Sequence, residues 1–157
     1  MKITLLLTGK TTEKYISEGI ELYEKRIKRY LPFEIKEIPA LKNNSSMSEE
    51  VQKKKEGEAI LKEISAPDFV LILDEKGKET DSIKFSGMLQ QYMNQSVKHV
   101  VFVVGGAYGF SDEVYKRANG KISLSKMTFS HQLVRLVFVE QLYRALTIIK
   151  GEPYHHS

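Results

Sequence analysis

Three short stretches of this sequence combine glycines, polar groups and apolar side chains in a way that could surround a ligand. They are residues 73–77 (Leu-Asp-Glu-Lys-Gly), 105–109 (Gly-Gly-Ala-Tyr-Gly) and 123–129 (Ser-Leu-Ser-Lys-Met-Thr-Phe). Each follows a predicted strand, and in an open parallel sheet ligands bind at the carboxyl ends of the strands. The paired glycines either let a ligand approach the main chain closely or only permit a sharp turn. Met127 and Phe129 are large apolar residues in a predicted loop, so we expect the core, a partner or an aromatic ligand to cover them.

A second group of polar residues lies near the C-terminus. Glu140 and Arg144 are four residues apart on a predicted helix, so they can form either a plain ion pair or part of a site. The segment after this helix carries Pro153, Tyr154 and two histidines, which are suited to stacking on a base and to hydrogen bonding. Chain ends usually fray unless something holds them, and we expect few core contacts here.

Several other chemistries are excluded or disfavoured. The absence of cysteine excludes disulfides, thiolate nucleophiles and cysteine-based metal sites. Gly9-Lys10-Thr11 follows a strand, but a phosphate-binding loop would need a glycine at position 4, where this chain has threonine. A nucleotide hydrolase therefore remains only a weak alternative. His155 and His156 are neighbours on a chain end and make a poor closed metal site, so we expect no metal.

Charge and hydropathy narrow the choice of partners. The net charge is +4, and residues 112–157 carry seven basic and four acidic side chains, a balance that permits a polyanionic partner. The longest runs of aliphatic or aromatic residues contain five residues, whereas a membrane span needs about 20. We therefore expect a cytoplasmic protein without a membrane segment.

The order of the elements predicts one α/β domain that spans residues 1–157. Hydrophobic patterns predict strands that alternate with helices, at about 2–8, 33–37, 69–73, 100–104 and 121–125. The third and fourth of these runs are apolar throughout, as is typical of central strands covered on both faces. We expect a mainly parallel sheet of five to six strands with helices on both faces. The last helix, about 131–150, is apolar nearly all round, so it is either central to the fold or shared with a second subunit.

Several motifs occur in an order and spacing that are specific to one family. They are Gly105-Gly106-x-x-Gly109, the stretch 124–131, Leu133-Val-Arg135, the stretch 139–145 and the ending Pro153-Tyr154-His155. In these motifs, and over its full length, the chain resembles the RlmH-type ribosomal RNA methyltransferases of the SPOUT superfamily. The resemblance implies a homodimer with a C-terminal trefoil knot. It also implies transfer of a methyl group from S-adenosylmethionine, without a metal, to N3 of a pseudouridine in the 23S rRNA of the assembled ribosome.

The resemblance also assigns individual residues. Those implied for the cofactor are Leu73, Gly105, Gly106, Leu124, Ser125, Lys126, Met127, Thr128 and Phe129. Glu140, Tyr154 and His155 are the candidates for catalysis. Arg135, Arg144 and His156 are the candidates for binding RNA, although some relatives carry arginine where this chain ends in His156-Ser157. An alternative is a ribosome-associated binding module that has kept the fold but has lost turnover.

Overall fold

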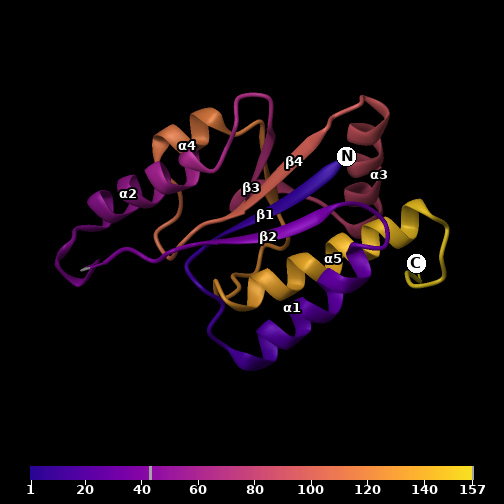
Figure 1. Cartoon of the computed structure of the whole chain (residues 1–157), viewed down its shortest axis with the longest axis horizontal. Coiled ribbons are helices and arrows are strands. Elements are labelled where there is room, and N and C mark those ends of the chain that lie inside the picture. Colours follow the sequence, from indigo (N-terminus) through magenta and orange to yellow (C-terminus); the bar gives the residue numbers. More distant parts are fainter. Residues whose placement is uncertain (43, 157) are drawn as a thin grey trace.

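The computed structural model describes residues 1–42 and 44–156. Strands and helices alternate along almost the whole chain (Figure 1). The elements are β1 (Lys2–Thr8), α1 (Lys14–Ile27), β2 (Phe33–Ile38), the 3₁₀ helix η1 (Asn44–Ser46), α2 (Glu49–Lys62), β3 (Phe69–Glu79), α3 (Ser82–Asn94), β4 (His99–Val104), α4 (Asp112–Arg117), β5 (Gly120–Ser123) and α5 (Leu133–Ile149).

Five parallel strands form one sheet in the order β2-β1-β4-β3-β5. Parallel pairing brings the carboxyl ends of β3 and β4 to the same edge, where Leu73 lies opposite Val104. The α/β fold with a parallel sheet is thus confirmed, at five strands.

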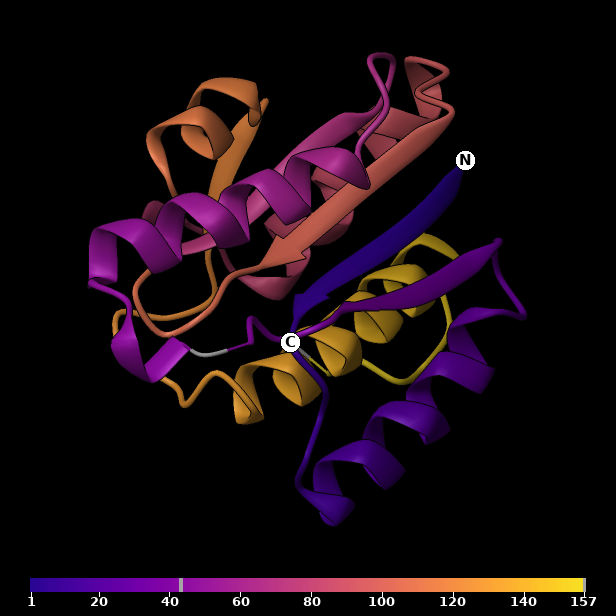
Figure 2. The same cartoon turned by 60° about the vertical axis from the view of Figure 1, so that its left-hand side comes forward.

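Helices cover both faces of the sheet. The side chains of Leu5, Leu7 and Phe102 face the side where α1, α3 and α5 pack. Alternate residues such as Leu6 and Val103 point to the opposite side, where α2 and α4 lie. Figure 2 shows α2 lying across the sheet on the side away from α1 and α5. Strands that are buried on both faces explain the apolar runs without alternation.

The third strand differs from its predicted extent. It continues past Leu73 to Glu79, and its pairing with β5 shifts register between Leu73 and Lys78, both of which lie opposite Ile122. Residues 74–77 therefore bulge out of the ladder at the edge where a ligand would bind. The fifth strand ends earlier than predicted, at Ser123.

The last helix is central to the fold. Helix α5 packs against both α1 and α3, and Phe138, Val139 and Leu142 are fully buried. Burial within one chain accounts for part of its apolar surface, whereas Val137, Ile148 and several other apolar residues of α5 are only half-buried, so a second subunit remains an explanation for the rest. A search of residues 1–42 and 44–156 finds no helix that is long and apolar enough to cross a membrane.

Candidate active site

A cavity of about 520 Å³ opens at the carboxyl ends of the central strands. Its walls come from the bulge after Leu73, the turn after β4 and the loop between β5 and α5. The structure brings together eight of the nine predicted cofactor residues as lining residues: Leu73, Gly105, Gly106, Leu124, Ser125, Met127, Thr128 and Phe129. Lys126, the ninth, is exposed and does not line the cavity.

Serine side chains shape the loop that closes one side of the cavity. Ser123 Oγ donates to the carbonyl of Ser125 at 2.9 Å, and Ser125 Oγ accepts from the amide of Met127 at 2.9 Å. These local bonds replace the strand ladder and turn the chain, as serine commonly does in loops. The side chain of Met127 is left 78% exposed, so it belongs to the wall of the cavity and not to the core.

The cavity also contains an acid and a phenol that the sequence-based assignment missed. The hydroxyl of Tyr115 donates to Oδ2 of Asp74, and Oδ1 accepts from the amide of Lys76 at 2.8 Å. Burial, reinforced by the hydrogen bond to Asp74, raises the pKa of Tyr115 to about 12. The position of Asp74 directly after a predicted strand was the signal that could have identified it as a site residue. Tyr115 lies on α4, on the face of the sheet that α2 also covers, and no local pattern indicated it.

A polar cluster forms where the chain end meets α5. Oε1 of Glu140 accepts from Arg144, with Nη2 at 2.6 Å and Nε at 3.1 Å, and from the hydroxyl of Tyr154 at 3.0 Å. Nη1 of Arg144 lies 3.2 Å from Nδ1 of His155. Four residues that the sequence singled out for catalysis or RNA binding therefore meet in one place.

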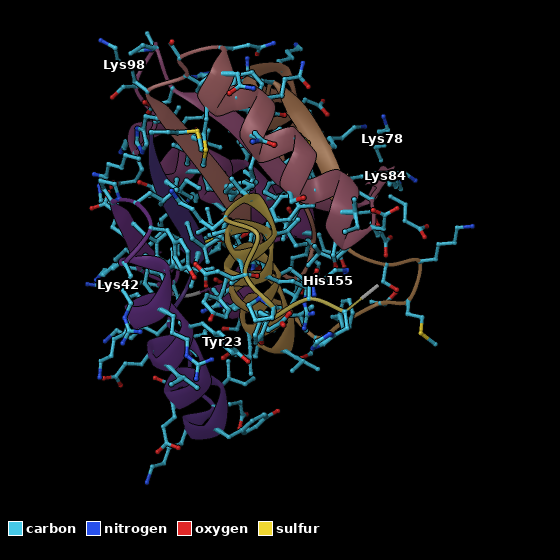
Figure 3. All side chains as sticks on the ribbon, turned by 90° about the vertical axis from the view of Figure 1, so that its right-hand side faces the viewer. Tyr23, Lys42, Lys78, Lys84, Lys98 and His155 are labelled. Carbon is cyan, nitrogen blue, oxygen red and sulfur yellow. The ribbon has the colours of Figure 1, made fainter. Side chains whose placement is uncertain are left out.

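The chain end is held in position, contrary to the expectation of few core contacts. The ring of Tyr154 packs on Tyr143 at 4.7 Å and under the guanidinium of Arg144 at 4.7 Å. Its hydroxyl also lies 3.4 Å from that of Tyr23 on α1, and Figure 3 labels Tyr23 and His155 on these two segments. Burial and the hydrogen bonds to Tyr23 and Glu140 raise the pKa of Tyr154. His156 is exposed, and Ser157 lies outside the described residues.

Arg135 is not placed to bind RNA. Its side chain is 1% exposed, and its guanidinium donates to the carbonyls of Thr8 and Gly9 and to the hydroxyl of Thr11 at 2.9–3.0 Å. Burial lowers the pKa of Arg135. The residue fastens the β1–α1 loop to the start of α5. Two of these hydrogen bonds are accepted by Gly9 and Thr11, within the Gly9-Lys10-Thr11 segment. This arrangement gives no support to a phosphate-binding loop at that segment.

The cavity and the polar cluster lie at different points along α5. Val134, near the start of the helix, lines the cavity, whereas none of Glu140, Arg144, Tyr154 and His155 does. At 1.5 Å per residue, Glu140 lies about 9 Å further along the axis than Val134. Among the described residues, no group of three or more His, Asp or Glu side chains is arranged to hold a metal ion.

Comparisons with known proteins show the family of the chain and agree with its fold. The family model described as "Predicted SPOUT methyltransferase" matches residues 1–155. The chain therefore belongs to the SPOUT methyltransferase family, which confirms the class that the motifs indicate. It is 55% identical over 157 residues, covering 100% of both chains, to a protein of Parabacteroides distasonis named ribosomal RNA large subunit methyltransferase H. A protein of Christiangramia forsetii with the same name is 54% identical over 156 residues, covering 99% of both chains.

A solved structure shares the fold at low sequence identity. The crystal structure of a probable methyltransferase from Bordetella pertussis covers 92% of this chain and 96% of its own, with a TM-score of 0.55 and 14% identity. This likeness supports the arrangement of strands and helices alone.

Proposed function

We propose that the cavity binds S-adenosylmethionine. Its volume of about 520 Å³ lies within the usual range for small-molecule sites, about 300–1,000 Å³. Leu73, Leu124 and Met127 offer apolar cover for an adenine ring, while the turn at 105–109 brings main-chain groups to the wall. The main support for the proposal is that the loops after three separate strands, β3, β4 and β5, line one cavity. When bound, the cofactor supplies an electrophilic methyl group.

The substrate we propose is N3 of a pseudouridine in 23S rRNA, within the assembled ribosome. Two relatives that are more than half identical over nearly their whole length are named as ribosomal RNA large subunit methyltransferases, which supports an rRNA substrate. The basic C-terminal third of the chain suits a polyanion. The alternative, a binding module without turnover, shares the fold and is separated by the experiment below.

The polar cluster suggests how N3 is prepared for methylation. Oε1 of Glu140 already accepts three hydrogen bonds, and Oε2 accepts one from Gln141 at 2.8 Å. We therefore propose that the role of Glu140 is to orient the side chains of Arg144 and Tyr154. A guanidinium can only donate, so Nδ1 of His155 accepts and its proton lies on Nε2 when the ring is neutral. This N–H and Arg144 can then stabilise the negative charge on the carbonyl oxygens beside N3 after its proton leaves to water.

We propose that the active enzyme is a cytoplasmic homodimer with a trefoil knot near the C-terminus. In one chain the polar cluster does not reach the cavity, so a second copy would be needed to bring a cluster to it. Tyr15 and Leu22 are large apolar residues exposed on α1, which packs against α5, and they offer a surface for that copy. Sedimentation at micromolar concentration that gave a folded monomer would contradict the dimer.

Two measurements test the activity. Titration calorimetry should show binding of S-adenosylmethionine without RNA or metal, and no binding of ATP. Incubation of ribosomes that lack the modification with methyl-labelled cofactor should place the label in 23S rRNA, at N3 of a pseudouridine. Binding of the cofactor without transfer to rRNA would favour the non-catalytic module, and binding of ATP alone would favour the hydrolase.

A further inference from the structure

One carboxylate next to the cavity has no role in the site described so far. Glu56 lies on α2, and its Oε2 is buried without a hydrogen-bond partner among the described residues. Within residues 1–42 and 44–156, its other oxygen, Oε1, accepts one bond, from Nε2 of Gln52 at 3.3 Å. Buried polar atoms are paired in the great majority of cases, so an unpaired one needs an explanation.

The carboxyl group of Glu56 lies against the glycine turn. A Cβ atom built on Gly106 would lie 2.7 Å from Oε2 and 3.0 Å from Oε1 of Glu56. Gly106 lines the cavity, whereas Glu56 does not, so the carboxyl group contacts the turn from the side of α2. Only a residue without a side chain fits between the carboxyl group and the cavity.

A second glycine makes this close approach of α2 possible. Gly57 is buried, and a Cβ atom at this position would lie 2.2 Å from Oγ of Ser111. Glycine is unfavourable inside a helix, so its presence here is explained by packing. Figure 2 shows the chain that leaves β4 running past the first half of α2. Helix α2 therefore packs directly against the segment 105–111.

The turn itself has little internal support. One main-chain hydrogen bond closes it, from the amide of Gly109 to the carbonyl of Gly106 at 3.3 Å. Gly109 adopts φ of 82°, and Ala107, Tyr108 and Gly109 are exposed. A segment with few contacts needs a neighbour to fix its conformation.

We propose that Glu56 is a positioning residue that holds the glycine turn in the conformation that receives the ligand. Its carboxyl group packs against Gly106 and restrains the turn by this close contact, since Oε2 accepts no hydrogen bond among the described residues. The part of this proposal that concerns S-adenosylmethionine rests on the proposed function. Burial, the largest cause, raises the pKa of Glu56, in agreement with an enclosed carboxyl group.

Amide hydrogen exchange of the free protein tests the support of the turn directly. In Glu56→Ala the amide of Gly109, which donates the hydrogen bond that closes the turn, should exchange about tenfold faster, while those of the central strands stay protected. Glu58→Ala, an exposed position on the same helix, is the matched control and should leave the turn unchanged. Unchanged exchange at the amide of Gly109 in a folded Glu56→Ala protein would overturn the proposal, whatever ligand the cavity binds. If that variant does not fold, Glu56→Asp, which keeps the charge on a shorter side chain, replaces it.

Ligand affinity gives an independent readout with its own rescue. Glu56→Ala should weaken binding of S-adenosylmethionine about tenfold in calorimetry. Gly106→Ala should also weaken it, because the new Cβ meets the carboxyl group, and adding Glu56→Asp should restore much of the affinity. Losses that simply add in the double variant would argue for general destabilisation and against positioning. A wild-type protein that does not bind the cofactor would contradict the proposed function, and the exchange experiment would still decide the role of Glu56.

Discussion

The hydroxyl group of Tyr154 donates a 3.0 Å hydrogen bond to Oε1 of Glu140, the same oxygen that accepts from Nε and Nη2 of Arg144. One carboxylate oxygen thus joins the end of the chain to the last helix. Arg144 in turn contacts Nδ1 of His155, so the orientation of the histidine depends on this arrangement. The chain end around Tyr154 and His155 is therefore already folded onto α5 in the free protein.

Tyr154→Phe should separate the hydrogen bond from the packing. The ring contacts with Tyr143 and Arg144 remain, whereas the bond to Glu140 is lost, which should lower the free energy of unfolding by about 1 kcal/mol. Methylation of ribosomes should fall about tenfold, as expected for a loss of about 1.4 kcal/mol of transition-state stabilisation. Cofactor affinity should change little, because Tyr154 does not line the cavity of its own chain and the substitution keeps the ring in place. Tyr92→Phe, on α3 and outside the lining of the cavity, is the control, and full methylation by Tyr154→Phe would exclude a role for this bond.

Arg135→Met tests a structural role against RNA binding. The substitution keeps much of the side-chain volume but leaves the carbonyls of Thr8 and Gly9 without the buried guanidinium as their donor, so stability should fall by about 3 kcal/mol in urea denaturation. Arg29→Met, an exposed change near the end of α1, should have little effect. If Arg135 instead bound phosphate, its loss would leave stability unchanged and would reduce the salt dependence of ribosome binding.

The sequence was sufficient for the outline of the fold and for the cavity. Two apolar runs, 69–73 and 100–104, identified the central strands, and the rule for the carboxyl ends of parallel strands then located the ligand loops. Leu73 lies opposite Val104, the residue before Gly105, because the two strands are neighbours in the sheet. The positions of the strands and of their loops follow from local hydrophobic patterns, which can be read from a single sequence.

Contacts between distant segments could not be predicted in this way. Three of the four acceptors of Arg135 lie more than 120 residues earlier in the chain, so no local pattern could show that its guanidinium binds the β1–α1 loop. The part of β3 beyond Leu73 consists mostly of polar residues, which give no hydrophobic strand pattern. It pairs with β5 again at Lys78 and Glu79, after the bulge. Likewise, the contact of Glu56 with Gly106 depends on how α2 packs over the sheet.

The alkaline titration of Tyr115 should be displaced from that of an ordinary tyrosine. Its pKa is raised from 10.0 to about 12, so the folded state favours the neutral hydroxyl. The stabilisation is therefore fully present below pH 10 and is lost as the pH rises from 10 to about 12. The difference in phenolate absorbance between the wild type and Tyr115→Phe should titrate near pH 12. The difference isolates this residue from Tyr30, whose pKa is also raised to about 12 by burial and Glu152. A difference that titrated near pH 10 would contradict the hydrogen bond to Asp74.

Met127→Ser tests whether this exposed apolar side chain covers the ligand. Because Met127 is 78% exposed, the free energy of unfolding should stay within about 0.5 kcal/mol of the wild-type value. Burying a methionine side chain under a ligand stabilises the complex by about 1.5 kcal/mol or more, so the affinity for S-adenosylmethionine should fall about tenfold.

Lys126→Ser is the matched control for Met127→Ser, since Lys126 is the next residue in the same loop but does not line the cavity. Calorimetry should show almost wild-type affinity for this control. Equal losses in the two variants would mean that the loop contributes through its conformation and not through the methionine side chain. Full affinity in Met127→Ser would leave the apolar cover of the ligand to Leu73, Leu124 and Phe129.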